Sequence, residues 1–202
     1  MSSQPGKQTD LHGSAPDNSG AALLLVDLIN DFEYPGGDLL FENARRIAGP
    51  IRALKRRARQ ANIPVIYVND NFGRWQSSFR EIVERCLSSD VRGREFVEQL
   101  TPCPDDYFVL KPKHSAFYQT PLDLLLKHLG TKRVILAGLC TNSCILASAN
   151  DAYMRDLEIY VPSDCVAAQT QEDQQYSLHH MQEMNKANTS PSSELDLAKL
   201  AS

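Results

Sequence analysis

Residues 21–26 read Ala-Ala-Leu-Leu-Leu-Val, and the carboxylate residue Asp27 follows them directly. The run is apolar at every position, which is the pattern of a strand that is covered on both faces. Such strands belong to parallel sheets, because the crossover helices of a parallel sheet lie on its two faces. This stretch therefore predicts that the chain is built around a parallel sheet.

Further short apolar runs follow along the chain, and segments with helical spacing of their apolar residues separate them. The unbroken runs predict strands at 64–68, 107–110, 133–137 and 158–161. The helical patterns cover 43–61, 79–87, 95–100, 122–129, 143–154, 171–184 and a short stretch within 194–201. This alternation predicts a doubly wound α/β fold, with a mainly parallel sheet and helices on both of its faces.

Composition and charge limit the class of protein. The chain has 202 residues, 42% of them hydrophobic, and a formal net charge of −4. Residues 1–20 are rich in Ser, Gly, Pro and Asn and are predicted to be a flexible leader, so that 21–202 form one domain. The mild acidity argues against a nucleic-acid partner. The apolar runs are far shorter than the roughly 20 residues of a membrane span.

The cysteine content indicates the compartment. Five Cys is an odd number and too few for a disulfide scaffold, so a reducing compartment is expected. The N-terminus also shows no apolar stretch preceded by positive charge. We therefore expect a cytoplasmic protein that acts on a small molecule, without nucleic acid or membrane as a partner.

Three reactive residues follow predicted strands. Asp27 ends the first strand, Lys111 ends the third, and Cys144 opens the helix after the fourth. The carboxyl ends of parallel strands share one edge of the sheet, where ligands bind in open α/β folds. We therefore expect the carboxylate, the ammonium and the thiol to converge. Each also has an ordinary interpretation, since Asp27 could begin a loop and Lys111 could lie on the surface.

The five cysteines differ in their setting. Cys86, Cys103 and Cys165 are interpreted as small core residues. Cys144 lies in the first turn of a predicted helix, where orphan N–H groups and a nearby ammonium favour the thiolate and lower its pKa. The spacing from Cys140 to Cys144 is C-x-x-x-C, which fits neither a zinc site nor a C-x-x-C redox pair.

These residue types suggest a division of chemical roles. A thiolate can attack an electrophilic carbon, and a nearby carboxylate can take the thiol proton and return it to the leaving group. The ammonium would hold the carboxylate, and backbone N–H groups around 139–144 could bind a developing oxyanion. The reaction class is acyl transfer to Cys144 followed by hydrolysis. The absence of G-x-G-x-x-G and of a P-loop argues against nucleotide binding.

Three ordered blocks resemble the isochorismatase-like cysteine hydrolases. Asp27-Leu28-Ile29-Asn30-Asp31-Phe32 resembles the family's D-x-x-N-D-F opening, and Lys111-Pro112-Lys113-His114-Ser115-Ala116-Phe117 is similar to its K-x-x-x-S-A-F block. Gly138-Leu139-Cys140-Thr141-Asn142-Ser143-Cys144-Ile145 is similar to its G-x-x-T-x-x-C-V block, and Ala149-Asn150-Asp151-Ala152 follows it. The resemblance covers about residues 21–185.

The resemblance implies more than the residues alone predict. It implies a six-stranded sheet, an Asp27–Lys111–Cys144 triad and a cis peptide between Leu139 and Cys140. That peptide would place the Cys140 N–H beside the Cys144 N–H as an oxyanion hole. Relatives of this kind release ammonia or a carbamoyl group from small amides, and they commonly form homo-oligomers, either dimers or tetramers.

The sequence departs from the family pattern at the position of a metal site. Family nicotinamidases hold a metal through an Asp and two His after the second strand, but no His occurs between residues 13 and 113 here. Asp70 alone makes a poor metal site, so we expect no metal and no cofactor. Because Cys144 is retained, an amide, ureido or carbamoyl substrate is favoured. The alternatives are an ether hydrolase of the isochorismatase type that uses Asp27 and Lys111 alone, and a catalytically silent binding module.

Five residues near the blocks are candidates for the substrate pocket. They are Phe32, Asn71, Trp75, His114 and Phe117. Ordinary core packing is an equally good interpretation for Trp75 and Phe117, and His114 could be an exposed loop residue.

Overall fold

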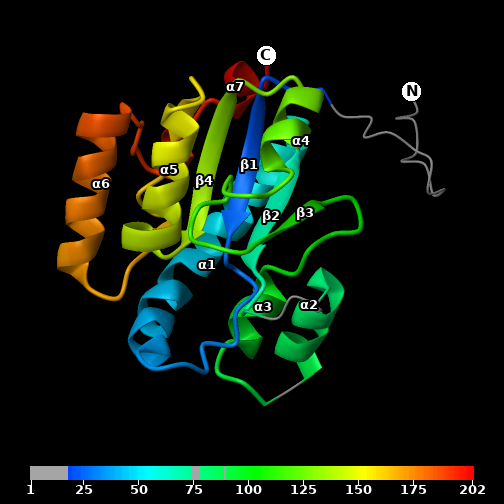
Figure 1. Ribbon diagram of the computed structural model, residues 1–202, viewed down its shortest axis with the longest axis vertical. Coiled ribbons are helices and arrows are strands. Elements are labelled where there is room, and N and C mark those ends of the chain that lie inside the picture. Colours follow the sequence, from blue (N-terminus) through cyan, green and yellow to red (C-terminus); the bar gives the residue numbers. More distant parts are fainter. Residues whose placement is uncertain (1–17, 74–77, 89) are drawn as a thin grey trace.

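The computed structural model describes residues 18–73, 78–88 and 90–202. A six-stranded parallel sheet forms its centre, in the order β3-β2-β1-β4-β5, with β6 paired to β4 (Figure 1). The strands are β1 (Ala21–Val26), β2 (Val65–Asp70), β3 (Tyr107–Lys111), β4 (Arg133–Leu139), β5 (Glu158–Tyr160) and β6 (Val166–Ala167). The predicted parallel sheet is confirmed.

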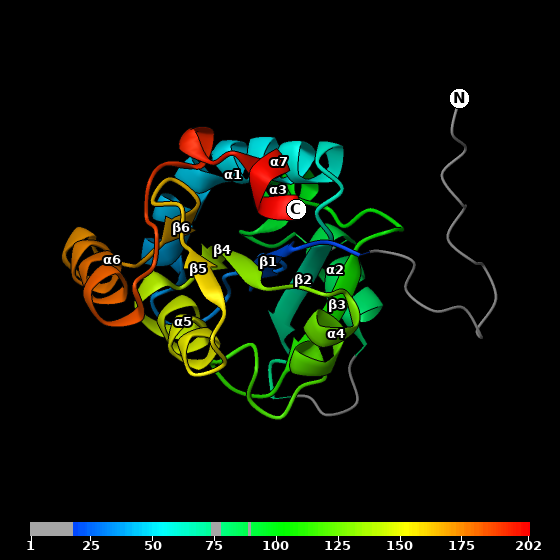
Figure 2. The ribbon, with the colours of Figure 1, turned by 90° about the horizontal axis from the view of Figure 1, so that it is seen from above.

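Helices cover both faces of this sheet. Figure 2 shows α1, α3 and α7 on one face and α4 and α5 on the other, with α6 beside α5. The helices are α1 (Gly37–Gln60), α2 (Phe79–Ser88), α3 (Arg94–Gln99), α4 (Leu122–His128), α5 (Leu146–Tyr153), α6 (Gln171–Asn185) and α7 (Leu197–Ala201). A π-helical turn (Thr141–Ile145) precedes α5, and a 3₁₀ turn (Ser192–Glu194) precedes α7. The doubly wound architecture is confirmed.

Several boundaries differ from the prediction for local reasons. Helix α1 begins at Gly37 and not at residue 43, because Gly36 takes a left-handed conformation with φ 80° just before it. Strand β6 was not predicted, since two residues are too short to produce a recognisable apolar run. The predicted helix 143–154 begins two residues earlier, as the π-helical turn.

The burial of β1 explains its unbroken apolar sequence. All six of its residues have no exposed surface. Leu23 and Leu25 belong to the core cluster that includes α1, whereas Leu24 and Val26 belong to the cluster that includes α4 and α5. Successive side chains of a strand point to opposite faces, so a strand covered on both sides must be apolar throughout.

The start of the described chain is attached to the domain. The Ser19 N–H donates to the carbonyl of Leu129, and the Gly20 N–H donates to that of Ala201. Residues 1–17 of the expected leader lie outside the described residues. None of the described helices is both long enough and apolar enough to span a bilayer.

The strand order places a switch point beside β1. The chain runs outward from β1 through β2 to β3 and then returns to add β4 on the other side of β1. In open α/β sheets the carboxyl edge at such a reversal is the usual place for a ligand. The residues that follow β1 and β4 therefore face one another across this point.

Candidate active site

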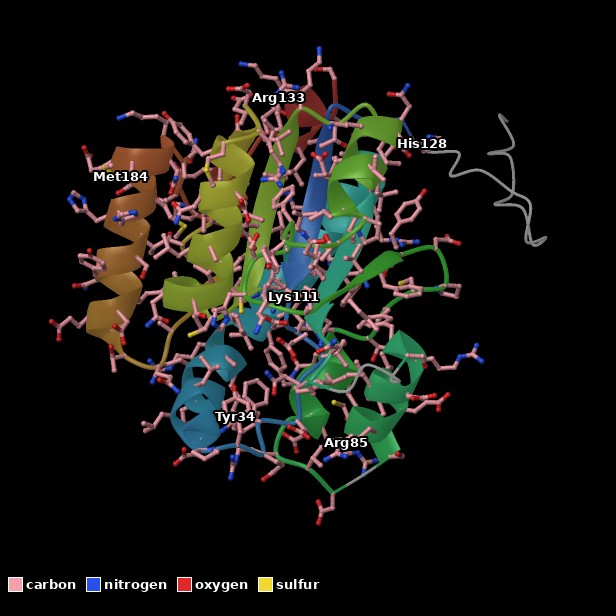
Figure 3. The ribbon with its side chains drawn as sticks, in the orientation of Figure 1. Tyr34, Arg85, Lys111, His128, Arg133 and Met184 are labelled. Carbon is pink, nitrogen blue, oxygen red and sulfur yellow. The ribbon has the colours of Figure 1, made fainter. Side chains whose placement is uncertain are left out.

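The ammonium group of Lys111 connects the three predicted reactive residues. Its Nζ lies 3.0 Å from a carboxylate oxygen of Asp27 and 3.4 Å from Sγ of Cys144. It also lies 3.5 Å from a carboxylate oxygen of Asp70 and 3.2 Å from the carbonyl oxygen of Lys113. In Figure 3, Lys111 lies near the middle of the molecule, where the strands end. The structure therefore brings the acid, the amine and the thiol together.

The sheet geometry explains why a lysine is needed at position 111. Lys111 ends β3, and β2 lies between it and β1, which Asp27 follows. Neighbouring strands lie about 4.8 Å apart, so only a long side chain reaches across β2. The Lys111 side chain has no exposed surface, and its stem passes Asp70, which is its partner in the β2–β3 register.

Asp27 is held rigidly where β1 ends. Its backbone takes a left-handed conformation with φ 52°, and one carboxylate oxygen accepts a 2.7 Å hydrogen bond from the Asp70 N–H. The loop beyond it is fastened by the Asn69 side chain, which accepts from the Ile29 N–H and donates to the Ile29 carbonyl. The carboxylate that faces Lys111 is therefore fixed by contacts from β2.

The turn that presents Cys144 begins at a close approach of two strands. Gly138 has φ 129°, and a Cβ on it would lie 2.0 Å from the carbonyl oxygen of Val26. The next peptide, between Leu139 and Cys140, is cis. The Cys140 carbonyl then accepts from the N–H groups of Ser143 and Ile145. This arrangement closes the π-helical turn that holds Cys144.

Two serine side chains that were not predicted as site residues attach the loop after Lys111 to helix α5, which follows Cys144. Ser148 Oγ accepts from the Ala116 N–H at 2.9 Å and donates to the Cys144 carbonyl at 2.6 Å. Ser115 Oγ donates to the Asp151 carboxylate. These contacts give Ser115, Ala116 and Asp151 a structural role, because they attach the loop after β3 to helix α5.

Burial dominates the electrostatics of the three groups. Desolvation raises the pKa of Asp27, although the Lys111 charge and hydrogen bonds from Cys144, Lys111 and Asp70 oppose it. Desolvation alone would lower the pKa of Lys111, but the charges of Asp27, Cys144 and Asp70 outweigh it and raise that pKa. Lys111 is therefore an ammonium at neutral pH.

The expectation of a lowered pKa at Cys144 is wrong. Desolvation first, and then the Asp27 charge, raise the pKa of Cys144 to about 12, and the opposing effect of Lys111 is smaller. The sequence placed this residue correctly in a first helical turn, but it could not show that the thiol is buried beside a carboxylate. Cys144 is therefore a thiol at rest, and a base is required to make it a nucleophile.

Two of the five pocket candidates are core residues in the structure. The Phe32 side chain has no exposed surface and packs edge-on against Phe96, with ring centroids 5.6 Å apart. Phe117 is 3% exposed and packs in the α4–α5 core beneath the guanidinium of Arg155. Their burial supports the interpretation of both as core packing.

The other three candidates have different outcomes. Asn71 lines a cavity beside the site, and His114 lies at the exposed surface with Nδ1 3.7 Å from Cys144 Sγ. Trp75 lies outside the described residues.

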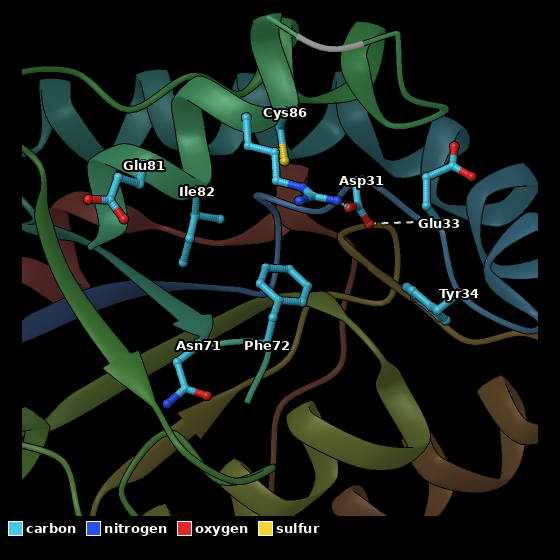
Figure 4. Close-up of a pocket in the computed structure, with 9 residues that line it drawn as sticks. Asp31, Glu33, Tyr34, Asn71, Phe72, Glu81, Ile82 and Cys86 are labelled. Atoms are coloured by element: carbon cyan, nitrogen blue, oxygen red, sulfur yellow. Dashed lines mark hydrogen bonds and ion pairs between the residues drawn. The ribbon is translucent and has the colours of Figure 1, made fainter. Parts of the chain in front are cut away.

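The cavity has a volume of about 280 Å³ and lies between the loops after β1 and β2 and helix α2. Figure 4 shows Tyr34, Phe72, Ile82 and Asn71 around it. Sequence reasoning missed Tyr34, which is 38% exposed. Burial raises the pKa of its phenol, and a hydrogen bond with Asn30 opposes this shift. The place of Tyr34 just after the D-x-x-N-D-F block was the available signal.

Comparisons with known proteins show the family to which the chain belongs. The Isochorismatase domain model matches residues 21–192. This chain belongs to the isochorismatase family. Members of the family are hydrolases, and this chain is a hydrolase.

Two curated relatives each match 80% of this chain. Isochorismatase family protein YaaI of Bacillus subtilis is 42% identical over 161 residues, which are 80% of this chain and 88% of that protein. Enterobactin synthase component B of Escherichia coli is 29% identical over 170 residues, which are 80% of this chain and 57% of that protein. This chain therefore matches only about half of the length of that relative.

A solved structure with a similar fold is N-carbamoylsarcosine amidase from Thermoplasma acidophilum. It is 28% identical with a TM-score of 0.66, and the match covers 87% of this chain and 98% of that one.

The metal that some isochorismatase-family enzymes hold does not fit the residues of this chain. Asp70 binds Lys111 through one oxygen and accepts from the Phe72 N–H through the other. No group of three or more His, Cys, Asp or Glu within the described parts of the chain is arranged to bind a metal. Imidazoles are also missing from the sequence between positions 13 and 113. No step of the chemistry below runs through a metal.

Proposed function

We propose that this isochorismatase-family hydrolase is a metal-independent cysteine amidohydrolase. It would cleave the C–N bond of a small amide, ureido or carbamoyl compound through a thioester on Cys144. One observation carries the proposal, namely that the Lys111 ammonium contacts both the Asp27 carboxylate at 3.0 Å and the Cys144 sulfur at 3.4 Å. The similarity to an N-carbamoylsarcosine amidase supports the same bond type.

The first half-reaction follows from the two raised pKa values. A thiol with a pKa of about 12 is not a nucleophile at neutral pH. Burial raises the pKa of Asp27, which makes its carboxylate a stronger base toward the hydrogen-bonded Cys144 thiol. The S–H proton passes to Asp27, sulfur attacks the acyl carbon, and the proton is delivered to the leaving nitrogen as the C–N bond breaks. Lys111 stabilises the negative charge as it moves between carboxylate and sulfur.

Stabilisation of the oxyanion is assigned to the backbone. We propose that the N–H groups of Cys140 and Cys144 bind the acyl oxygen, as the family resemblance implies. The cis peptide at Cys140 and the π-helical turn before α5 set the course of this backbone. Fixed donors at the position where charge develops are often the largest single contribution to acyl-transfer catalysis. Water then hydrolyses the thioester and regenerates Cys144.

A second candidate is the cleavage of a vinyl ether, the reaction for which the family is named. Asp27 and Lys111 would suffice for it without a nucleophile, so the two candidates differ in their need for sulfur. We favour amide chemistry because Cys144 contacts Lys111, which places the sulfur inside the same polar network.

The deciding experiment is a screen for ammonia release over small primary amides, ureides and carbamoyl amino acids. It compares the wild type with Cys144→Ser and Asp27→Asn, and uses Cys103→Ser as the control for loss of a thiol elsewhere. Both site variants should lose activity, whereas the control should retain it. Ether cleavage that survives in Cys144→Ser, without any amide hydrolysis by the wild type, would favour the second candidate.

Two further proposals rest on composition and family resemblance. They are a cytoplasmic location and assembly as a dimer or tetramer, whereas Ser19 and Gly20 of the expected leader are bonded to the domain. Light scattering coupled to size-exclusion chromatography of the whole chain would measure the oligomeric state directly.

A further inference from the structure

His114 is an acid–base group that contacts the sulfur but has no role in the first half-reaction. Its Nδ1 lies 3.7 Å from Cys144 Sγ and 3.2 Å from Ser143 Oγ. A ring nitrogen of histidine can accept a proton or donate one, depending on its protonation state. The Cys144 sulfur therefore has a third ionisable neighbour besides Asp27 and Lys111.

The imidazole is held in place by its surroundings. The Ser143 hydroxyl bonds Nδ1 directly, and Ser143 belongs to the same turn as Cys144. The next residue in the chain, Ser115, is tied to Asp151 of α5, and the Ala116 N–H is tied to Ser148 of α5. These bonds attach the His114 loop to the helix that follows the cysteine. The distance between Nδ1 and Sγ is therefore set by more than one contact.

The groups around Sγ differ in their access to solvent. Asp27 is 7% exposed and Lys111 has no exposed surface. Among the described side chains that contact Cys144 Sγ, His114 is the exposed one, since Ser143 is half-buried. The water that hydrolyses a thioester comes from solvent, and His114 is the exposed ionisable group that contacts Sγ.

We propose that His114 is a further catalytic residue, the general base of thioester hydrolysis. This inference rests on the proposed function, because it requires an acyl group on Cys144. It divides the proton transfers between two residues. Asp27 serves the buried side during acylation, and His114 serves the solvent side during deacylation.

The proposed step balances as follows. An O–H bond of water breaks, its proton passes to neutral His114, and the oxygen forms a bond to the acyl carbon. The C–S bond then breaks, so that the carboxylic product leaves and Cys144 remains as a thiolate. The imidazolium Nδ1 returns the proton to the sulfur, over the contact of 3.7 Å. Cys144 is again a thiol, His114 is again neutral, and one water has been consumed.

The test separates acylation from deacylation with p-nitrophenyl acetate as the acyl donor. Rapid-mixing absorbance follows p-nitrophenolate release, and intact-protein and peptide mass spectrometry follow acetyl-Cys144. In the wild type the acetyl group should form and then hydrolyse. In His114→Gln the burst of p-nitrophenolate should remain, whereas deacylation should slow about 100-fold, as is typical when a general base is removed. Acetyl-Cys144 should then accumulate.

Matched variants distinguish a base from a merely structural residue. His179→Gln alters an exposed histidine of α6 and should leave both steps unchanged. In His114→Gly, added imidazole should accelerate deacylation, which a structural defect would not allow. Ser143→Ala, which removes the hydrogen bond to the ring and a 4.0 Å contact with Cys144 Sγ but keeps the imidazole, should slow deacylation less than His114→Gln.

The outcomes separate the two proposals. Acetyl-Cys144 that decays equally fast in His114→Gln and in the wild type would overturn the role of His114 and leave the cysteine mechanism intact. A wild type that forms no acetyl-Cys144 would overturn both. If circular dichroism shows that His114→Gln does not fold, the deacylation rate of Ser143→Ala is used instead. A rate equal to that of the wild type would count against His114 as the general base.

Discussion

The ammonium nitrogen of Lys111 lies 3.0 Å from a carboxylate oxygen of Asp27, inside the protein and across an intervening strand. Both charges are buried, and each depends on the other to remain ionised. The pair therefore ties the stability of the domain to the same atoms that the proposed chemistry uses.

Removal of the Lys111 ammonium should lower the stability of the domain as well as its activity. Lys111→Met leaves the Asp27 carboxylate buried without its counter-ion, which typically lowers the free energy of unfolding by about 3–5 kcal/mol. Urea denaturation followed by circular dichroism measures the change. Lys113→Met, two residues away with an exposed side chain, is the control and should shift the free energy by no more than about 0.5 kcal/mol. Equal stability of the two variants would show that the buried pair contributes nothing.

The reactivity of Cys144 should depend on pH in a direction that the Asp27 charge sets. With a pKa of about 12, the thiolate fraction of Cys144 grows throughout the neutral and mildly alkaline range. Its alkylation by iodoacetamide should therefore accelerate steadily with pH and show no plateau near neutrality. Asp27→Asn removes a charge that raises this pKa, so Cys144 should be alkylated faster in that variant although hydrolysis is lost.

Peptide mass spectrometry measures the alkylation rate, with Cys103 as the reference thiol in the same sample. Slower alkylation of Cys144 in Asp27→Asn would contradict the sign assigned to the Asp27 charge. A wild-type rate that is already constant across neutral pH would contradict the raised pKa.

The contact between β1 and β4 should not tolerate a side chain at Gly138. A Cβ there would lie 2.0 Å from the Val26 carbonyl oxygen, and the φ of 129° suits glycine alone. Gly138→Ala should therefore lower the free energy of unfolding by about 3 kcal/mol or more, through overpacking and backbone strain.

Gly49→Ala is the matched control, because Gly49 is exposed within α1 and its Cβ would meet nothing within 4 Å. That variant should change the free energy of unfolding by no more than about 0.5 kcal/mol, since the better helix propensity of alanine is opposed by the proline ring of Pro50, which follows it. Thermal and urea denaturation of both variants provide the comparison. A Gly138→Ala protein as stable as the wild type would show that the two strands can move apart.

Removal of metal should leave hydrolysis unchanged. Both carboxylate oxygens of Asp70 already have partners, Lys111 and the Phe72 N–H, and imidazoles are absent from the sequence around it. Dialysis against a chelator, followed by the ammonia assay with and without added Zn²⁺, tests this. Activity that disappears on dialysis and returns with Zn²⁺ would contradict metal independence.

Much of the architecture could be read from local patterns. The unbroken run at 21–26 and its counterparts along the chain predict strands buried on both faces, and the structure places them in one parallel sheet. Once the strands are parallel, residues that follow them share an edge, so the meeting of Asp27, Lys111 and Cys144 was predictable without coordinates. Strand β6 was not, because its two residues carry no periodic signal.

Burial and neighbouring charge were decided by the tertiary structure. The sequence shows that Cys144 opens a helical segment, but the direction of its pKa shift depends on desolvation and on Asp27, which is 117 positions earlier in the chain. Phe32 and Phe117 lie inside the blocks that resemble the family pattern, yet both pack in the core, and only packing distinguishes a core ring from a pocket wall. His114 gains its contact with sulfur because Ser143, Ser148 and Asp151 hold two loops together.

The sequence alone therefore determined the order of elements, the class of fold and which reactive groups share an edge, because these depend on periodicity and on the direction of strands. The tertiary structure decided the protonation state of the thiol, the walls of the cavity and the side from which His114 meets the sulfur. These properties depend on distances between residues far apart in the chain and on the exclusion of water, and neither is encoded in any local pattern.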